Sequence, residues 1–153
     1  MAHIGDLLET LADNLPQPSP AVWQETRHLC QGELKLHLTL LCQVVVPELA
    51  KRTQGKDDYE ALLCCLSGDF ENDLSRLTDL DDMFSEVIGK HSDSRTYEAF
   101  GFALRACFEA VRRLVRWESE VLLPMVERWL ADADAEFLLG EIAPRDDRYL
   151  RLN

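Results

Sequence analysis

Two stretches of the chain share a pattern in which one residue capable of acid–base chemistry stands where a core residue is expected. His37 lies ten positions before Pro47, and Glu118 lies six positions before Pro124. Each proline follows an apolar triplet, Val-Val-Val in the first stretch and Val-Leu-Leu in the second. Imidazole and carboxylate groups bind iron, zinc and manganese, and they also form charge-assisted hydrogen bonds with each other. These two residues are therefore the strongest candidates for chemistry.

Both residues fall on the apolar faces of predicted helices. Alternating steps of three and four residues from Cys30 reach His37, and the same steps from Phe100 reach Glu118. An unpaired buried carboxylate is costly, so Glu118 needs a partner, a proton or a metal. We expect the two side chains to face each other as a buried polar pair.

The elements that would position this pair are helices, because no stretch shows the alternation typical of a half-buried strand. The predicted helices span about 2–15, 20–52, 57–79, a continuation or separate turn over 81–90, and 95–131, with a last turn near 133–140. We predict an all-α protein, specifically a four-helix bundle with a short first helix. The bundle domain is expected over 1–131, and a C-terminal turn and tail over 132–153.

The two prolines lie inside these predicted helices. A proline in a helix interior removes one backbone donor and its ring clashes with the preceding turn. We therefore expect each helix either to kink at Pro47 and Pro124 or to end there and begin again.

Length, composition and charge narrow the class of protein. With 153 residues and 46% hydrophobic residues, the chain is expected to form one domain with a proper core. Its formal net charge of −12 disfavours binding to nucleic acid or to an acidic membrane. Continuous apolar runs are shorter than the ~20 residues that span a bilayer, and the first residues lack a basic export signal. We expect a cytoplasmic protein without membrane or nucleic-acid partners.

The cysteines favour the same compartment. They are five in number, sit within apolar runs and form no Cys-x-x-Cys motif: Cys30, Cys42, Cys64, Cys65 and Cys107. We interpret them as reduced core thiols rather than disulfides or zinc ligands. No activated serine or cysteine arrangement and no phosphate-binding loop is recognisable, so we expect no enzymatic activity.

The paired motifs resemble those of hemerythrin-like (HHE cation-binding) domains, four-helix bundles that hold two irons between histidines and carboxylates. The family motif is His-x-x-x-Glu followed by an apolar triplet and a proline ten residues after the histidine. On that template His37 and Glu118 occupy ligand positions, but Leu41 stands in place of a glutamate and Leu114 in place of a histidine. Residues four apart share one helix face, which explains the spacing.

The resemblance also concerns the first and third helices. A histidine ligand near the start of the first helix could be His3, whereas Phe70 stands where the third helix usually offers an acid–histidine pair. The resemblance thus implies metal ligands at His37, Glu118 and His3 that are vestigial. We expect no cofactor in this interpretation, with iron or zinc as the alternative.

Three hypotheses follow. In the first, the chain is a hemerythrin-like bundle that has lost most di-iron ligands and acts as a non-enzymatic regulatory or protein-interaction protein. In the second, His37 and Glu118, helped by His3 or Glu33, hold one Fe, Zn or Mn and sense oxygen, nitric oxide or metal. In the third, the motif match is coincidental. The stretches 66–71 and 96–100 are also similar to the regulator-of-sigma-D anti-sigma family, which suggests a transcription regulator.

The sequence does not identify the protein partner, but its charged and apolar surface residues indicate where a partner could bind. Between Asp69 and Glu86 there are seven acids and one arginine, interpreted as a solvated face that could receive a basic segment. Arg113 is expected to pair with Glu109 within its own helix. Because the first helix is short, one flank should be under-covered, and a homodimer would bury it.

Overall fold

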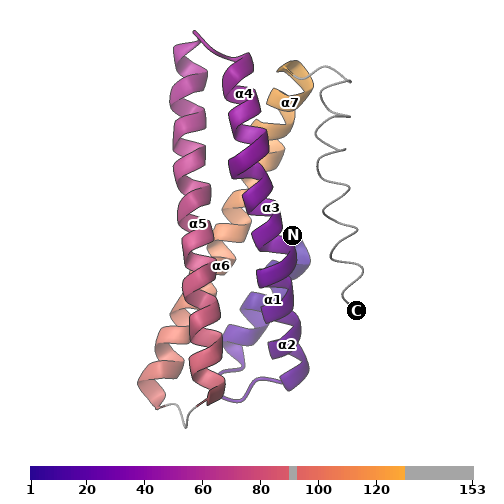
Figure 1. Cartoon of the computed structure of the whole chain (residues 1–153). Helices are drawn as coiled ribbons and strands as arrows, with labels where there is room; N and C mark the ends of the chain where they lie inside the picture. The colour runs from indigo at the N-terminus through magenta and orange to yellow at the C-terminus, as the bar shows by residue number, and fades with distance from the viewer. Residues whose placement is uncertain (90–92, 130–153) are drawn as a thin grey trace.

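The part of the chain that the structure describes is all-α and forms four helical rods (Figure 1). The computed structural model describes residues 1–89 and 93–129, and every regular element in these ranges is a helix. The all-α prediction is confirmed, whereas the predicted last turn and tail over 132–153 lie outside the described residues. In chain order, the elements are α1 (Ala2–Asp13), α2 (Pro20–Leu29), η1 (Cys30–Leu34), α3 (Lys35–Leu40), η2 (Leu41–Val45), α4 (Val46–Arg52), α5 (Asp57–Gly89), α6 (Ser94–Trp117), η3 (Glu118–Leu122) and α7 (Leu123–Trp129).

The second and fourth rods are continuous although each contains a proline. The segments η1, η2 and η3 are single turns of π-helix, in which the backbone bonds to the residue five positions back. The second rod runs from Pro20 to Arg52 and the fourth from Ser94 to Trp129. Thus the helices neither end nor restart at Pro47 and Pro124, and a π-turn precedes each of these prolines, η2 before Pro47 and η3 before Pro124.

The third rod is one uninterrupted helix. α5 passes without a break through residues 79–81, where the sequence left open a separate turn, and it reaches Gly89. It is preceded by a short connection in which Gly55 has a φ of 81°, a backbone conformation that glycine adopts without strain. The next rod begins after Asp93, whose side chain caps α6 by accepting a hydrogen bond from the Thr96 backbone N–H at 2.8 Å.

The rods pack with α1 against α2 and α6, while α5 contacts α3, α4 and α6. Three aromatic rings join the rods in the half that contains α1. Trp23, Phe84 and Phe100 lie with ring centroids 5.0–5.1 Å apart, Trp23–Phe84 and Phe84–Phe100 edge to face. Trp23 is 8% exposed, so it belongs to the core.

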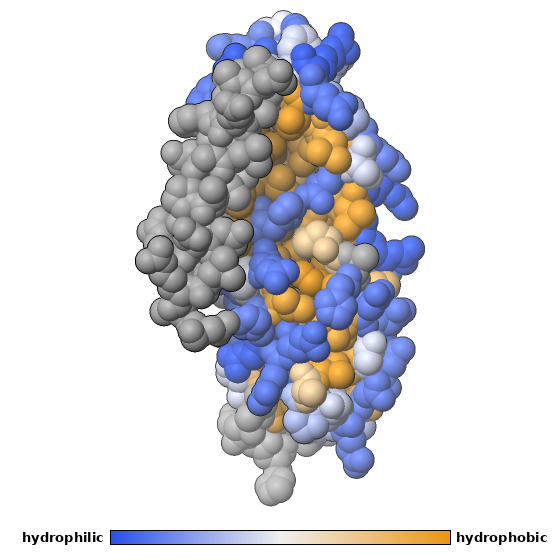
Figure 2. Space-filling view, turned by 90° about the vertical axis from the view of Figure 1, so that its right-hand side faces the viewer, coloured by the Kyte–Doolittle hydropathy of each residue, from blue (hydrophilic) through white to orange (hydrophobic). Residues whose placement is uncertain are grey.

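α1 covers only part of α6. Gly5 faces Phe108 and Val111 of α6, and Leu15 beyond the other end of α1 faces Gly101. Past Val111, apolar side chains of the fourth rod are exposed, Val115 at 40% and Leu123 at 56%. Figure 2 shows a face of the molecule on which hydrophobic residues reach the surface between hydrophilic ones. The exposure of Val115 and Leu123 shows that α1 leaves part of the fourth rod uncovered, as was predicted for a short first helix.

The second rod is also long and apolar enough to cross a membrane. An 18-residue window within Pro20–Arg52 has a mean hydropathy of 1.2. Helices of a soluble core meet the same criterion, and this rod packs against α1 and α5, so the feature is weak evidence for a membrane span.

Candidate functional site

His37 and Glu118 lie in contact with each other, although they are 81 positions apart in the sequence. His37 comes from α3, and Glu118 is the first residue of the π-turn η3. The contact joins Nε2 of the imidazole to Oε1 of the carboxylate. The two groups are complementary in hydrogen bonding, because a protonated imidazole is a donor and a carboxylate is an acceptor. The structure therefore brings together the two residues that the sequence singled out.

The pair is less buried than the sequence suggested. The side chain of His37 is 38% exposed and that of Glu118 is 21% exposed. The pair that was expected to be buried is thus half-buried. It lies where the second and fourth rods meet, past the N-terminal end of α1, and we call this line of contact between the two rods the seam. Solvent at this seam screens the pair and reduces the cost of burying its charges.

The two rods approach the pair through equivalent turns. The backbone N–H of Val46 donates to the Leu41 carbonyl, and that of Leu123 donates to the Glu118 carbonyl. Each π-turn therefore begins six residues before a proline and ends two residues before it. A proline ring would clash with the carbonyl four residues back in a regular α-helix, and the wider turn relieves this clash. Glu118 and Leu41 thus occupy matching positions, one polar and one apolar.

Hydrocarbon fills the other positions at which the family resemblance implies ligands. Leu41 is 6% exposed, Leu114 is 2% exposed and Phe70 is 1% exposed, and all three belong to the hydrophobic core. None of these side chains can donate or accept a coordinate bond. The interior beside the pair is therefore packed as an apolar core.

The remaining candidate ligands do not converge on the pair. His3 lies 3.3 Å from Glu25 Oε1, and both side chains are more than half exposed. Glu33 is exposed in η1. Within residues 1–89 and 93–129, no group of three or more His, Cys, Asp or Glu side chains could hold a metal ion together. The donor set at the seam is one imidazole and one carboxylate, which does not fit a di-iron centre.

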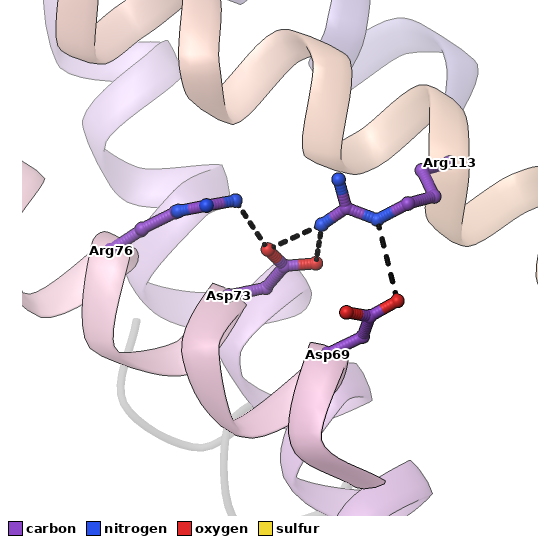
Figure 3. A network of polar contacts seen from close by, with 4 residues as sticks. All are labelled: Asp69, Asp73, Arg76 and Arg113. Atoms are coloured by element: carbon purple, nitrogen blue, oxygen red, sulfur yellow. Dashed lines mark hydrogen bonds and ion pairs between the residues drawn. The ribbon is translucent and has the colours of Figure 1, made fainter. Parts of the chain in front are cut away.

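A second polar cluster, which the sequence did not predict, joins α5 to α6 (Figure 3). Asp73 is only 4% exposed, and Nη2 of Arg113 donates to both of its carboxylate oxygens, at 2.8 and 2.9 Å. Nη1 of Arg76 donates to the same carboxylate at 3.0 Å, and Nε of Arg113 lies 3.9 Å from Asp69 Oδ2. The buried carboxylate is therefore fully compensated by charge-assisted hydrogen bonds.

This cluster corrects two expectations. The acids at the start of the acidic stretch do not all form a solvated face, because Asp73 is buried between rods. Arg113 pairs across the rods with Asp73, and Glu109 is instead 3.5 Å from Arg112. The missed signal was the spacing of Asp69 and Asp73, which puts two carboxylates on the face of α5 that also carries buried leucines and Phe70. Because its charges are mutually satisfied, the cluster is a structural link between rods.

The cysteines divide into two groups. Cys30 and Cys107 are buried, and burial raises the pKa of the Cys30 thiol to about 12 and that of Cys107 to about 11. Cys64 and Cys65 are exposed, so the prediction that all five are core thiols is wrong. Cys42 is half-buried, and its pKa is raised by burial and by the charges of Glu71 and Asp73. All five are free thiols, which leaves the buried ones protonated and weakly reactive at neutral pH.

Comparison with known proteins gave no relative. No protein-family model matches the chain, and no significant match was found among curated proteins or among solved structures.

Proposed function

We propose that this chain is a hemerythrin-like four-helix bundle in which packed side chains have replaced most of a di-iron centre, and that it acts as a non-enzymatic regulatory or protein-interaction protein. The observation that carries the proposal is the direct contact between His37 and Glu118 beside a core closed by Leu41 and Leu114. Two residues typical of metal ligands bind each other, while the positions matching theirs in the paired motif hold leucine. An anti-sigma-type transcription regulator would be one form of such a protein.

The surface supports a partner with a basic binding face. Acids on the outer side of α5 are exposed over several turns, among them Glu71, Asp79 and Asp82. The formal net charge of −12 adds a long-range field of the same sign. Such a field steers a basic partner and makes its association rate dependent on salt.

The partner hypothesis is tested by charge reversal on this face. Untagged protein is immobilised, and binding from its native lysate is compared for the wild type and the double variant Asp79→Lys with Asp82→Lys. A matched control reverses two exposed acids of α1, Asp6→Lys with Glu9→Lys, and so changes the net charge equally. We expect the α5 variant to lose the partner and the α1 variant to keep it. Equal retention by both variants would contradict a role for α5.

A second function, metal sensing at a mononuclear site, is supported by one observation. The His37 and Glu118 side chains are 38% and 21% exposed, so water and a metal ion could reach the seam. Iron or zinc would take the imidazole and the carboxylate as two ligands, with water completing the shell.

Elemental analysis separates the two functions. Metal content is measured in the purified protein before and after anaerobic iron loading, with His37→Ala and Glu118→Gln alongside. The interaction hypothesis predicts substoichiometric metal in all samples and a loss of stability in Glu118→Gln, because the imidazole loses its charged partner. If the wild type holds near-stoichiometric metal and His37→Ala does not, the interaction hypothesis is rejected in favour of metal sensing.

A further inference from the structure

The most exposed large apolar side chain among the described residues lies on the outer face of α6. Phe102 is 72% exposed, whereas Phe84 and Phe100 are fully buried in the core. α1 packs on another face of the same helix, where Leu15 lies against Gly101. Aromatic side chains are enriched at the centres of protein interfaces, where they contribute much of the binding energy. Phe102 is therefore a candidate contact for a partner.

Two opposite charges flank Phe102 along the helix. Glu98 lies four residues before it and Arg105 three residues after it, so the three side chains share one face of α6. Both charged side chains are exposed, and their contacts within the chain are long. Nη2 of Arg105 donates to Asp13 at 3.4 Å, and Glu98 accepts from the hydroxyl of Ser94 at 3.3 Å. Exposed contacts of this kind contribute little to stability, so both groups are available to a partner.

This order of side chains is complementary to its own reverse. Two copies of α6 that cross antiparallel can be related by a twofold axis that passes between Gly101 and Phe102. Glu98 and Arg105 lie at equal distances on either side of this axis, about 5 Å along the helix. Glu98 of each copy therefore faces Arg105 of the other, and the two Phe102 rings lie next to each other across the axis. Both kinds of contact are made without a change in the fold of either copy.

Charge favours a second copy of the chain as the occupant of this face. The exposed acids Glu98 and Glu109 alternate along it with the exposed Arg105 and Arg112. A uniformly acidic or uniformly basic segment would meet like charge at two of these positions, whereas a reversed copy of α6 meets opposite charge. The formal net charge of −12 on each copy opposes association. That repulsion is reduced at this face, because Arg105, Arg112 and the exposed Arg116 lie on it.

We infer that the protein forms a twofold-symmetric homodimer through the outer face of α6, with Phe102 at its centre and ion pairs between Glu98 and Arg105 on both sides. The contact of two single helices is smaller than the roughly 800 Å² per partner that is typical of stable complexes, so the dimer forms at micromolar concentrations. The inference goes beyond the proposed function and is independent of it, because it uses neither the acids of α5 nor the pair of His37 and Glu118.

Sedimentation velocity of the full-length protein tests the dimer. The wild type is measured from about 1 to about 300 μM, where we expect an equilibrium between monomer and dimer. Phe102→Ala should raise the dissociation constant at least about tenfold, because it removes the central contact. The matched control is Leu123→Ala, which is 56% exposed on the same rod but outside the crossing, and it should leave the constant unchanged. A monomer at all concentrations, an oligomer larger than a dimer, or equal constants for the two variants would overturn the inference.

Exchange of the two charges tests the antiparallel arrangement. Glu98→Arg and Arg105→Glu should each weaken the dimer, because like charges then face each other on both sides of the axis. The double variant restores both ion pairs with their signs exchanged, so its dissociation constant should return to within about threefold of the wild-type value. Both side chains are exposed, and circular dichroism checks that each variant keeps its helical fold. A double variant that dimerises no better than the single variants would refute the arrangement.

Discussion

Arg113 of α6 holds both carboxylate oxygens of Asp73 of α5 through one nitrogen, at 2.8 and 2.9 Å. This contact is the best-buried ionic link between rods in the described part of the chain, because Asp73 is 4% exposed. The Arg113 side chain, at 38% exposed, keeps partial access to water. The buried carboxylate of Asp73 therefore depends on this contact to stabilise its charge, whereas the guanidinium of Arg113 can also be stabilised by water.

This asymmetry predicts the effect of removing the arginine. Arg113→Met should lower the free energy of unfolding by about 1–3 kcal/mol, since it leaves a buried carboxylate with Arg76 as its remaining partner. The matched control is Arg112→Met, one position earlier, which removes an exposed contact at 3.5 Å. It should change stability by less than about 0.5 kcal/mol. Urea unfolding measures both, and equal effects would show that the cluster contributes no more than surface charges.

Because the interior beside His37 and Glu118 is packed with apolar side chains, a new charge there should destabilise the protein. Leu41→Glu would place a carboxylate at the position that matches Glu118, where the present side chain is 6% exposed. Without a metal, we expect a loss of about 3 kcal/mol or more, because the new charge is desolvated and His37 is already paired with Glu118. Leu41→Met keeps the volume and should cost less than about 1.5 kcal/mol. Thermal unfolding with and without Fe(II) is the measurement.

The measurement with Fe(II) tests whether position 41 can still bind a metal. If Leu41→Glu gains a metal-dependent rise in melting temperature that the wild type lacks, the position is a lost ligand, as the paired motifs suggest. Full stability of Leu41→Glu without metal would contradict the packed interior on which the proposed function depends.

The sequence predicted the rods better than it predicted the contacts between them. Apolar periodicity placed the second rod at 20–52, as observed, because that pattern reports burial along one helix. The pairing of His37 with Glu118 was also foreseeable, since two polar residues on two core faces must meet something. By contrast, Asp73 and Arg113 each have plausible partners within their own helices. Which partner they take depends on how α5 and α6 are rotated relative to each other, and the sequence does not give this rotation.

The π-turns and the exposed cysteines were missed for related reasons. A proline signals strain in a helix, but whether the strain produces a kink, a break or a π-turn depends on the packing on both sides. Cys64 and Cys65 lie in an apolar run, yet α5 presents its buried face through Leu63 and Leu66 instead. The apolar composition of this run therefore gave the wrong burial for the two cysteines, because the position of each residue around the helix decides which side chains are buried.

The thiols should react in the order of their exposure. With a disulfide reagent at pH 8, we expect two thiols, Cys64 and Cys65, to react rapidly and Cys42 more slowly. Cys30 and Cys107 should react only at the rate of unfolding, because both are buried and their pKa values are raised to about 12 and about 11. Absorbance of the released thiolate gives the count. Rapid reaction of four or five thiols would show that the core opens readily.

The same pKa values predict how stability depends on alkaline pH. A buried thiol with a raised pKa stays protonated after the unfolded thiol, with a pKa of 9.0, has ionised. The unfolded state then binds fewer protons, so stability is retained below pH 9 and falls as pH rises toward 11. Cys107→Ala should flatten this decline in urea midpoints between pH 8 and 10.5, whereas the exposed Cys64→Ala should leave it unchanged. An identical decline in both variants would assign it to other groups.

Pro47 offers a test of whether the π-turn before it still serves a site. In Pro47→Ala the backbone regains a donor and loses the ring that clashes with the preceding turn, so η2 can relax to α-helix. If the interior is packed hydrocarbon, stability should stay within about 1 kcal/mol of the wild type or rise, with metal content unchanged. Pro20→Ala is the control, because Pro20 is the first residue of α2, where proline fits a helix and removes no bond. A loss of bound metal in Pro47→Ala and not in Pro20→Ala would show that the wide turn positions ligands, and metal sensing would then replace the interaction hypothesis.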